Sequence, residues 1–351
     1  MAGTLTTSSA ENVIALCEQG IYEPCAGSTP IDLLARGMVE SATGDIENAK
    51  DLLTRAYFSL NDGFKNKAGV QLAVAYWRGG EKSEAWALLD TLPDSFDVLL
   101  TRAIIETDSD PKRALETLAK AQSYDVSRYR WGRLHNQRGI CRRRLGDIQG
   151  AKAEYEAALF FWQDCPFYEI AQNNLAAASE NSEEAHAHLD RAIDGLKGPY
   201  LAQSYDLKAK TFLREGHIDR ATQYAAWAVG LLENTDRKGW LAETLLTYSD
   251  ALIADDRYTE ALVQLDRVWE IGSYLDDSEL KLKAAQLICE HSKTLQKTYH
   301  VRSVQVALSK CRSFNAAARD LGISRQALQE FMRVHKLKDT TRRIKSLIKQ
   351  N

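Results

Sequence analysis

The sequence contains little proline or cysteine. Only 6 of its 351 residues are proline and 6 are cysteine, whereas alanine is abundant. This composition favours long helices over a β-sandwich, in which turn residues would recur often. The cysteines form no CxxC pair, and no histidine flanks them at a zinc spacing. They therefore predict neither a disulfide framework nor a metal site, and we expect reduced, mostly buried thiols.

Apolar runs long enough for membrane insertion are also missing. No run approaches the roughly 20 residues of a membrane span. The first residues carry neither the basic region nor the apolar stretch of a secretory signal. With 44% hydrophobic and 26% charged residues, the composition is that of a globular protein. We expect a cytoplasmic protein with no membrane partner and about two domains.

The charge is distributed unevenly along the chain. The formal net charge is −3, but residues 298–351 contain 12 Lys and Arg against 3 Asp and Glu. This segment therefore carries +9, and residues 1–297 carry −12. A basic segment on an acidic body suggests that only this segment meets a polyanion, which is nucleic acid or an acidic partner protein.

The body of the chain is an internal repeat. An alanine recurs after a short turn at intervals of 29 to 40 residues, at Ala49, Ala85, Ala114, Ala151, Ala185, Ala221 and Ala261. Glycine or a polar capping residue precedes each alanine, which predicts that one helix ends and another begins there. In most units a large residue follows four positions later and another alanine seven positions later. This spacing marks one buried face of a helix.

A small residue precedes several of these alanines by 12 positions, at Gly37, Ala73, Gly139 and Ala209. This pattern resembles the tetratricopeptide repeat (TPR) family, in which the small residue lets the second helix pack closely. Arg102 and Asn173 depart from the pattern. The resemblance implies an all-α fold, a TPR-like solenoid of about seven helical hairpins. Another helical-hairpin repeat with a less regular period is the alternative.

Four segments follow from this reading. Residues 1–28 form an N-terminal segment and residues 29–275 the TPR-like superhelical domain. Residues 276–297 are expected to be a capping or connecting helix. Residues 298–351 form a small basic domain.

The basic domain contains the sequence NAAARDLGISRQAL at positions 315–328. Gly322 suits a sharp turn between two helices, and Ser324 suits the N-cap of the second helix. The sequence resembles the Fis-like helix-turn-helix of many bacterial regulators. The resemblance implies a recognition helix from Ser324 to Lys336 that enters the major groove of double-stranded DNA.

Residues at the start of a recognition helix reach base edges, and basic residues elsewhere hold phosphates. The candidate DNA-binding residues are Ser324, Arg325, Gln326, Gln329, Arg333, Lys336, Lys338, Arg312 and Arg319. Glu330 and Val334 stand where the Fis-like family often has basic residues, so we expect weak non-specific binding. A small helical cap that merely ends the solenoid is the alternative.

The first helix of each TPR unit lines the concave surface of the solenoid. The candidate partner-binding residues on that surface are Arg133, Asn136, Arg143, Asn174, Gln203 and Lys210. Amides and cations in a groove bind a peptide backbone or a carboxylate. The alternative is that these polar and charged residues are merely solvated on the surface of the repeat.

The sequence contains no phosphate-binding glycine loop, HExxH or GxSxG motif. We therefore expect no enzyme activity, no catalytic residue, no metal and no cofactor. The leading expectation is a homodimeric transcription regulator of bacterial cytoplasm, with a DNA-reading C-terminal domain and a solenoid that dimerises or binds a protein or peptide. The alternative is a protein-interaction scaffold whose basic C-terminal domain docks on an acidic partner.

Overall fold

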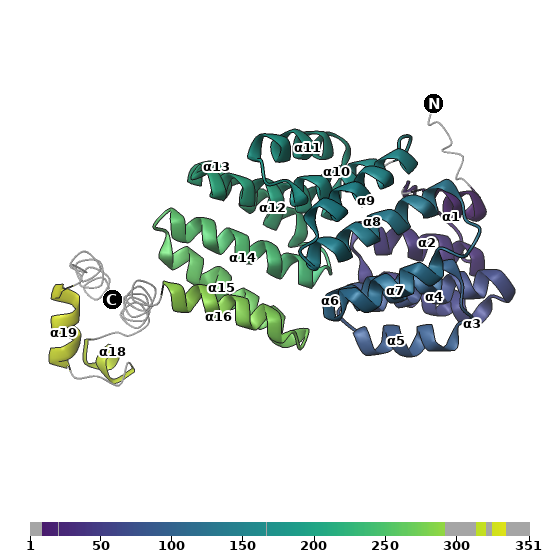
Figure 1. Ribbon diagram of the computed structural model, residues 1–351. Coiled ribbons are helices and arrows are strands. Elements are labelled where there is room, and N and C mark those ends of the chain that lie inside the picture. Colours follow the sequence, from purple (N-terminus) through teal and green to yellow (C-terminus); the bar gives the residue numbers. More distant parts are fainter. Residues whose placement is uncertain (1–8, 20, 166, 292–313, 321–324, 335–351) are drawn as a thin grey trace, which may run out of the picture.

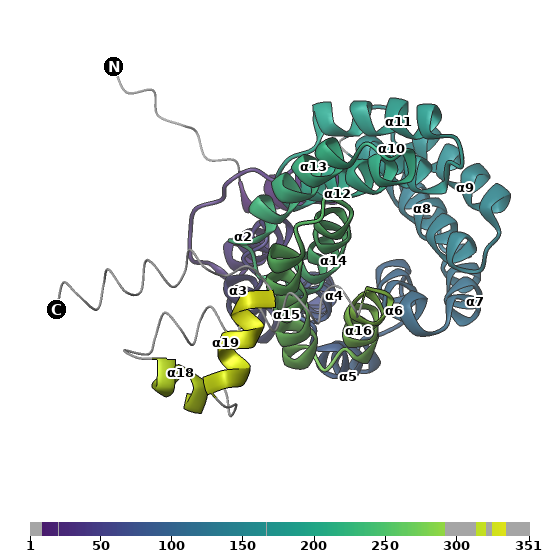
Figure 2. The same ribbon diagram turned by 90° about the vertical axis from the view of Figure 1, so that its left-hand side faces the viewer.

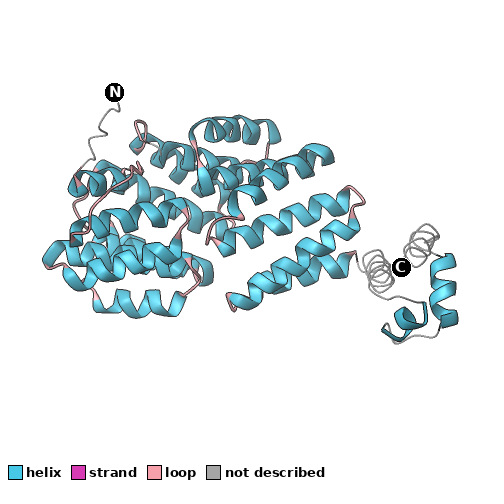
Figure 3. Cartoon of the chain, turned by 180° about the vertical axis from the view of Figure 1, so that it is seen from behind, coloured by secondary structure: helices cyan, strands magenta, loops and turns pink. Residues whose placement is uncertain are grey.

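The computed structural model describes residues 9–19, 21–165, 167–291, 314–320 and 325–334 (Figure 1). All regular elements within these residues are α-helices (Figure 3). Helix α1 (Ala10–Glu18) precedes seven helical hairpins, and α16 (Ser278–Glu290) follows them. Two short helices, α18 (Phe314–Asp320) and α19 (Arg325–Val334), are described in the basic segment. Residues 301–310, for which the sequence of the basic domain predicts a first helix, lie outside the described residues.

The seven hairpins are stacked in chain order. They are α2 (Pro30–Thr43) with α3 (Ile46–Ser59), α4 (Asp62–Arg78) with α5 (Lys82–Thr91), α6 (Phe96–Ser109) with α7 (Pro111–Ala121), α8 (Arg128–Arg144) with α9 (Ile148–Phe161), α10 (Phe167–Ala178) with α11 (Ser182–Gly195), α12 (Gly198–Glu215) with α13 (Ile218–Leu232), and α14 (Lys238–Ala254) with α15 (Tyr258–Tyr274). The chain is thus an all-α, TPR-like solenoid of stacked helix pairs, which confirms the expectation for the body.

The recurring alanines lie in the second helix of each hairpin and are fully buried. The large residues four positions later are buried as well, at Leu53, Leu89, Leu118, Tyr155, Leu189 and Leu265. Burying a leucine side chain stabilises a fold by about 1.5–3 kcal/mol. The residues that recur in the sequence are therefore the residues that form the buried core of each hairpin.

The small position of the first helix allows the two helices of a hairpin to approach closely. A Cβ atom at Gly139 would lie 2.4 Å from Cε1 of Tyr155, and one at Gly37 would lie 2.6 Å from Cγ of Leu53. Arg102 is accommodated in the third hairpin because its guanidinium leaves the interface. It donates hydrogen bonds to the carboxylate of Asp94 (2.8 Å) and to the carbonyl of Leu89 (3.0 Å).

The solenoid curves so far that its sixth and seventh hairpins meet its first. The loop between α13 and α14 docks on the turn between α2 and α3. The carboxylate of Asp236 accepts hydrogen bonds from the backbone amides of Ile46 (3.1 Å) and Glu47 (3.4 Å), and its own amide donates to the carbonyl of Gly44 (2.9 Å). Asp236 thus caps the first turn of α3, whose amides have no partner within their own helix.

Arg237 caps the C-terminal end of α2, the helix that precedes the same turn. Its guanidinium donates to the carbonyls of Ser41 and Ala42, both at 3.0 Å, at the end of α2. The side chain is only 3% exposed and lies 4.4 Å from the ring centroid of Trp240. Burial and the nearby Arg78 lower the pKa of Arg237 to about 10, so the group keeps its charge at neutral pH. A cation at a helix C-terminus is also favoured by the helix dipole.

The close approach at Gly139 is testable by substitution. Gly139→Ala forces a methyl group against Tyr155, so we expect the free energy of unfolding to fall by about 1–3 kcal/mol. Gly230→Ala is the matched control, because a Cβ at this exposed position of α13 meets nothing within 4 Å. The control is expected to gain up to about 1 kcal/mol. Urea denaturation followed by circular dichroism measures both, and equal stability of the two variants would contradict the packing argument.

The contact between the first and seventh hairpins gives a second test. Arg237→Ala removes two hydrogen bonds and leaves the carbonyl of Ala42 unpaired, whereas the carbonyl of Ser41 keeps its hydrogen bond from Arg78 (2.8 Å). We expect a loss of about 2–4 kcal/mol. Arg257→Ala, which removes an exposed arginine paired with Glu260, is expected to change stability by less than about 1 kcal/mol. Hydrogen exchange by mass spectrometry should show faster exchange at residues 41–47 in the Arg237 variant alone. Unchanged exchange there would refute the capping role.

Candidate functional site

The inner side of the solenoid carries the predicted partner-binding residues. Figure 2 shows α6, α8, α10 and α12 on the inner side, with the second helices α7, α9, α11 and α13 outside them. The candidates come from three of the inner helices, namely Arg133, Asn136 and Arg143 from α8, Asn174 from α10, and Gln203 and Lys210 from α12. We name the surface around these residues the inner face.

Two of these residues are brought into direct contact. The side-chain amide of Asn174 donates a hydrogen bond of 2.7 Å to the side-chain oxygen of Asn136, across the interface of α8 and α10. Both side chains are half-buried. The NH2 group of Asn136 and the side-chain oxygen of Asn174 make no hydrogen bond within the described part of the chain. The pair therefore offers one donor group and one acceptor to an extended peptide.

The charged candidates have partners of their own. Nη1 of Arg133 lies 3.5 Å from Asp97, a carboxylate that also binds Arg130 at 2.6 Å. Lys210 pairs with Asp206 one turn earlier on α12, at 2.6 Å. A ligand would therefore have to compete with Asp97 and Asp206 for these two cations.

The remaining candidates differ in their surroundings. Arg143 is half-buried and lies near Tyr155 inside its own hairpin, where burial raises the pKa of Tyr155 to about 12. Gln203 is half-buried and makes no hydrogen bond to another described residue. The structure thus brings together the two asparagines, whereas Arg143 belongs to the hairpin core.

The end of α1 and the residues that follow it also belong to this surface, although no sequence pattern predicts it. Glu18 pairs with Lys67 of α4 and lies 3.9 Å from Arg130 of α8. The hydroxyl of Tyr129 lies 3.3 Å from the side-chain oxygen of Gln19. Burial raises the pKa of Tyr22, which lies within reach of the charge of Arg133. The segment thus covers the amino-terminal half of α8, and nothing in the local sequence indicates these contacts because they join residues 49 to 112 positions apart.

The two helices of the basic segment present a polar face and a buried face. Ala317 and Ala318 of α18 and Leu328 and Met332 of α19 are buried. The candidates on α19 are all exposed and follow one another along one face of the helix, at Arg325, Gln326, Gln329 and Arg333.

The other DNA-binding candidates are placed differently. Arg319 is exposed on α18, where its Nε lies 3.4 Å from the carbonyl of Asn315. The remaining four lie outside the described residues, at Arg312, Ser324, Lys336 and Lys338.

The described ranges contain neither a metal-binding cluster nor a membrane-spanning helix. No three His, Cys, Asp or Glu side chains there are arranged to hold a metal ion. None of the helices in those ranges combines the length and apolarity required to cross a bilayer. His135, for which the sequence shows no evident partner, in fact pairs with Glu154 at 2.7 Å.

The stacked pairs and the curved inner face define the class of protein as a TPR-like α-solenoid. No family model matches the chain, and no curated protein matches it by sequence. A STAND-type signal transduction ATPase with a tetratricopeptide repeat sensor, from Pyrococcus horikoshii, is similar in fold, with a TM-score of 0.51, 14% identity and coverage of 95% of this chain and 54% of that chain.

Two further solved structures are similar at lower scores. The Cut9–Hcn1 hetero-tetramer of the APC/C gives a TM-score of 0.48 and 14% identity over 68% of this chain and 46% of that chain. A tetratricopeptide repeat protein from Parabacteroides merdae gives 0.46 and 16% identity over 74% and 100%. The chain thus spans about half the length of two of these proteins. At such identities the likeness defines the fold alone.

Proposed function

We propose that the chain is a protein-interaction scaffold that binds an extended segment of a partner protein on its inner face. The observation that carries this proposal is the Asn136–Asn174 pair, whose amides are half-exposed and keep unused hydrogen-bonding groups. Amide side chains recognise a peptide backbone through a donor and an acceptor together, independently of the side chains of the peptide. The proposal assigns a binding role and no catalytic step.

The charges around the pair set the preference for the partner. Arg133 and Arg130 share the carboxylate of Asp97. Glu18 also lies near Arg130 but pairs with Lys67 as well. Three cations thus meet two carboxylates, which leaves an excess of positive charge on this part of α8. An acidic group on the bound segment would be stabilised there, because a charge-assisted hydrogen bond is about twice as strong as a neutral one. The basic C-terminal segment, with its net charge of +9, would dock separately on an acidic surface of the same partner.

DNA binding by the basic segment is a second candidate function. It is favoured by the exposed row of Arg325, Gln326 and Gln329 on α19, beside the buried Leu328 and Met332. Arginine binds guanine and glutamine binds adenine through paired hydrogen bonds. One such helix reads few base pairs, so this function implies a homodimer on two half-sites.

The inner-face proposal is tested with a displayed library of random peptides, selected on the full chain. The double variant Asn136→Ala, Asn174→Ala is expected to weaken the binding of selected peptides by about tenfold or more, because two hydrogen bonds of about 1 kcal/mol each are lost. Gln149→Ala, an exposed amide on the outer helix α9, is the control and should bind as the unaltered chain does. Equal binding by the double variant and the control would remove the inner face from consideration.

Selection of bound duplexes from a random DNA library tests the second candidate. If α19 reads bases, the full chain enriches an inverted repeat, and Arg325→Ala loses about tenfold in affinity for it with a relaxed preference at one base position. Arg55→Ala, an exposed arginine on α3, leaves binding unchanged. No enriched duplex at low salt would favour docking on an acidic protein.

A further inference from the structure

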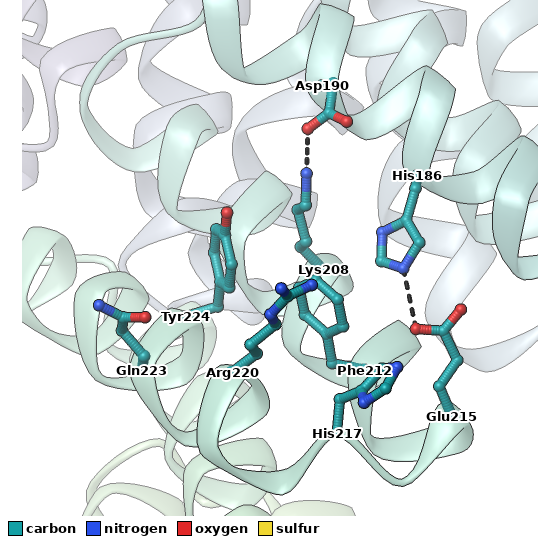
Figure 4. A pocket seen from close by; sticks show the side chains of 9 residues that line it. All are labelled: His186, Asp190, Lys208, Phe212, Glu215, His217, Arg220, Gln223 and Tyr224. Carbon is teal, nitrogen blue, oxygen red and sulfur yellow. Dashed lines mark hydrogen bonds and ion pairs between the residues drawn. The ribbon is translucent and has the colours of Figure 1, made fainter.

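The outer side of the solenoid contains a cavity of about 440 Å³ between α11, α12 and α13 (Figure 4). Helices α11 and α13 form its walls, and α12 lies between them. The inner-face residues do not line it. Its chemistry is therefore independent of the function proposed above.

The carboxylates in this cavity already have cationic or hydrogen-bonding partners. Lys208, which is 6% exposed, forms an ion pair with Asp190 across α11 and α12. Nε2 of His186 lies 3.0 Å from Oε2 of Glu215. The hydrogen bond from His186 lowers the pKa of Glu215, so this carboxylate is ionised at neutral pH. Lys208 neutralises Asp190, whereas Glu215 is held by its hydrogen bond to His186 and keeps its negative charge.

Three hydrogen-bonding side chains on the other wall have no polar partner. Arg220 forms no ion pair within the described chain, and its guanidinium lies over the ring of Phe212, 5.6 Å from the guanidinium carbon to the ring centroid. The side chains of Gln223 and His217 make no hydrogen bond to any described residue. In Figure 4 these side chains border the same space as Lys208. Among the described residues Arg220 is therefore the lining cation that has no carboxylate within ion-pair distance, and hydrogen-bonding side chains lie around it.

The aromatic rings of the cavity are covered by protein groups. The ring of Phe212 contacts His186 at 4.5 Å and Arg220 at 5.6 Å between centres, and the ring of Tyr224 lies under the ammonium group of Lys208 at 5.5 Å. A nucleobase would need an open ring face for stacking. A doubly charged phosphate would also meet Asp190 and Glu215 with only one unpaired cation to balance it. A singly charged carboxylate matches the available charge best.

An exposed aromatic residue borders the cavity. Trp227 is 45% exposed, and its ring packs edge-on against Tyr224 at 5.1 Å. Trp227 and Arg220 lie seven positions apart on α13 and therefore on the same face of that helix. Tryptophan and arginine are the residue types that dominate binding energy at protein interfaces. A partner with an acidic residue next to an apolar one would contact both.

We propose that this cavity is a second docking site, in which Arg220 binds an aspartate or glutamate side chain of a partner protein while Trp227 packs against the apolar residue beside it. Arg220 supplies a planar pair of N–H donors that matches a carboxylate. Gln223 and His217 supply further hydrogen bonds. The site allows the solenoid to hold one partner on its inner face and another on its outer side.

The test uses hydrogen exchange by mass spectrometry on the full chain with a short peptide of alternating Glu and Leu residues. The peptide is expected to slow exchange in residues 182–232. Localised exchange separates this site from binding to the basic C-terminal segment or to the inner face. Arg220→Gln is expected to raise the half-saturating peptide concentration by about tenfold, and Trp227→Ala by a few-fold.

Three controls test whether the cavity recognises a carboxylate of a peptide through Arg220. Arg214→Gln removes a neighbouring exposed arginine that does not line the cavity and should behave as the unaltered chain. The same peptide with Gln in place of Glu should protect residues 182–232 about tenfold more weakly. Free glutarate should give no protection at the same concentration.

Several results would overturn the proposal. Protection only outside 182–232 would mean that the peptide binds elsewhere. Equal protection by the Gln peptide would mean that the carboxylate is not recognised. Protection by glutarate as strong as by the peptide would identify a site for a small carboxylate instead of a docking site. Equal effects of the Arg220 and Arg214 variants would show that Arg220 has no specific role.

Discussion

The last carbonyls of α2 and the first amides of α3 have no partners within their own helices, and residues nearly two hundred positions later in the chain supply them. Asp236 accepts from the amides, and Arg237 donates to the carbonyls. A helical repeat array has contacts mainly between neighbouring units, so its curvature is soft unless distant units also touch. Here one loop between α13 and α14 caps both ends of a distant turn. The curvature of the inner face depends on this contact.

The consequences reach the candidate site. With the first and seventh hairpins held together, α1 and the segment after it lie against α4 and α8, where Glu18 meets Lys67 and Arg130. Among the described residues this arrangement leaves unused hydrogen-bonding groups on the inner face at the Asn136–Asn174 pair and at Gln203. The outer side has a different character. In its cavity between α11 and α13, Arg220 has no ion-pair partner among the described residues, and the exposed Trp227 lies next to the cavity on α13. Two surfaces with different chemistry are what a scaffold needs in order to hold two partners.

Close packing inside each hairpin is a local property and could be predicted. The glycine at 139 and the tyrosine at 155 were identified by spacing alone, and the structure brings them into contact. The sequence shows that Arg102 stands where the repeat has a small residue. It does not show how the arginine is accommodated, because the salt bridge to Asp94 depends on the path of a loop. Of the inner-face candidates, only Asn136 and Asn174 proved to be bonded to each other. Their spacing along the chain gave the register of the repeat, but no indication of this bond.

The sequence by itself determined the class of fold, the number of hairpins and the residues of the core, because these follow from a helical period that repeats locally and buries one face. It also identified the exposed polar row on α19. Only the tertiary structure decided which side chains meet across hairpins. Asp236, Arg237 and Tyr22 carry no motif, and Arg220 becomes notable only beside Phe212 and Lys208. Such contacts depend on the angle between the first and the last hairpin, which is the sum of the small rotations between neighbouring hairpins. A local sequence pattern does not determine that total angle.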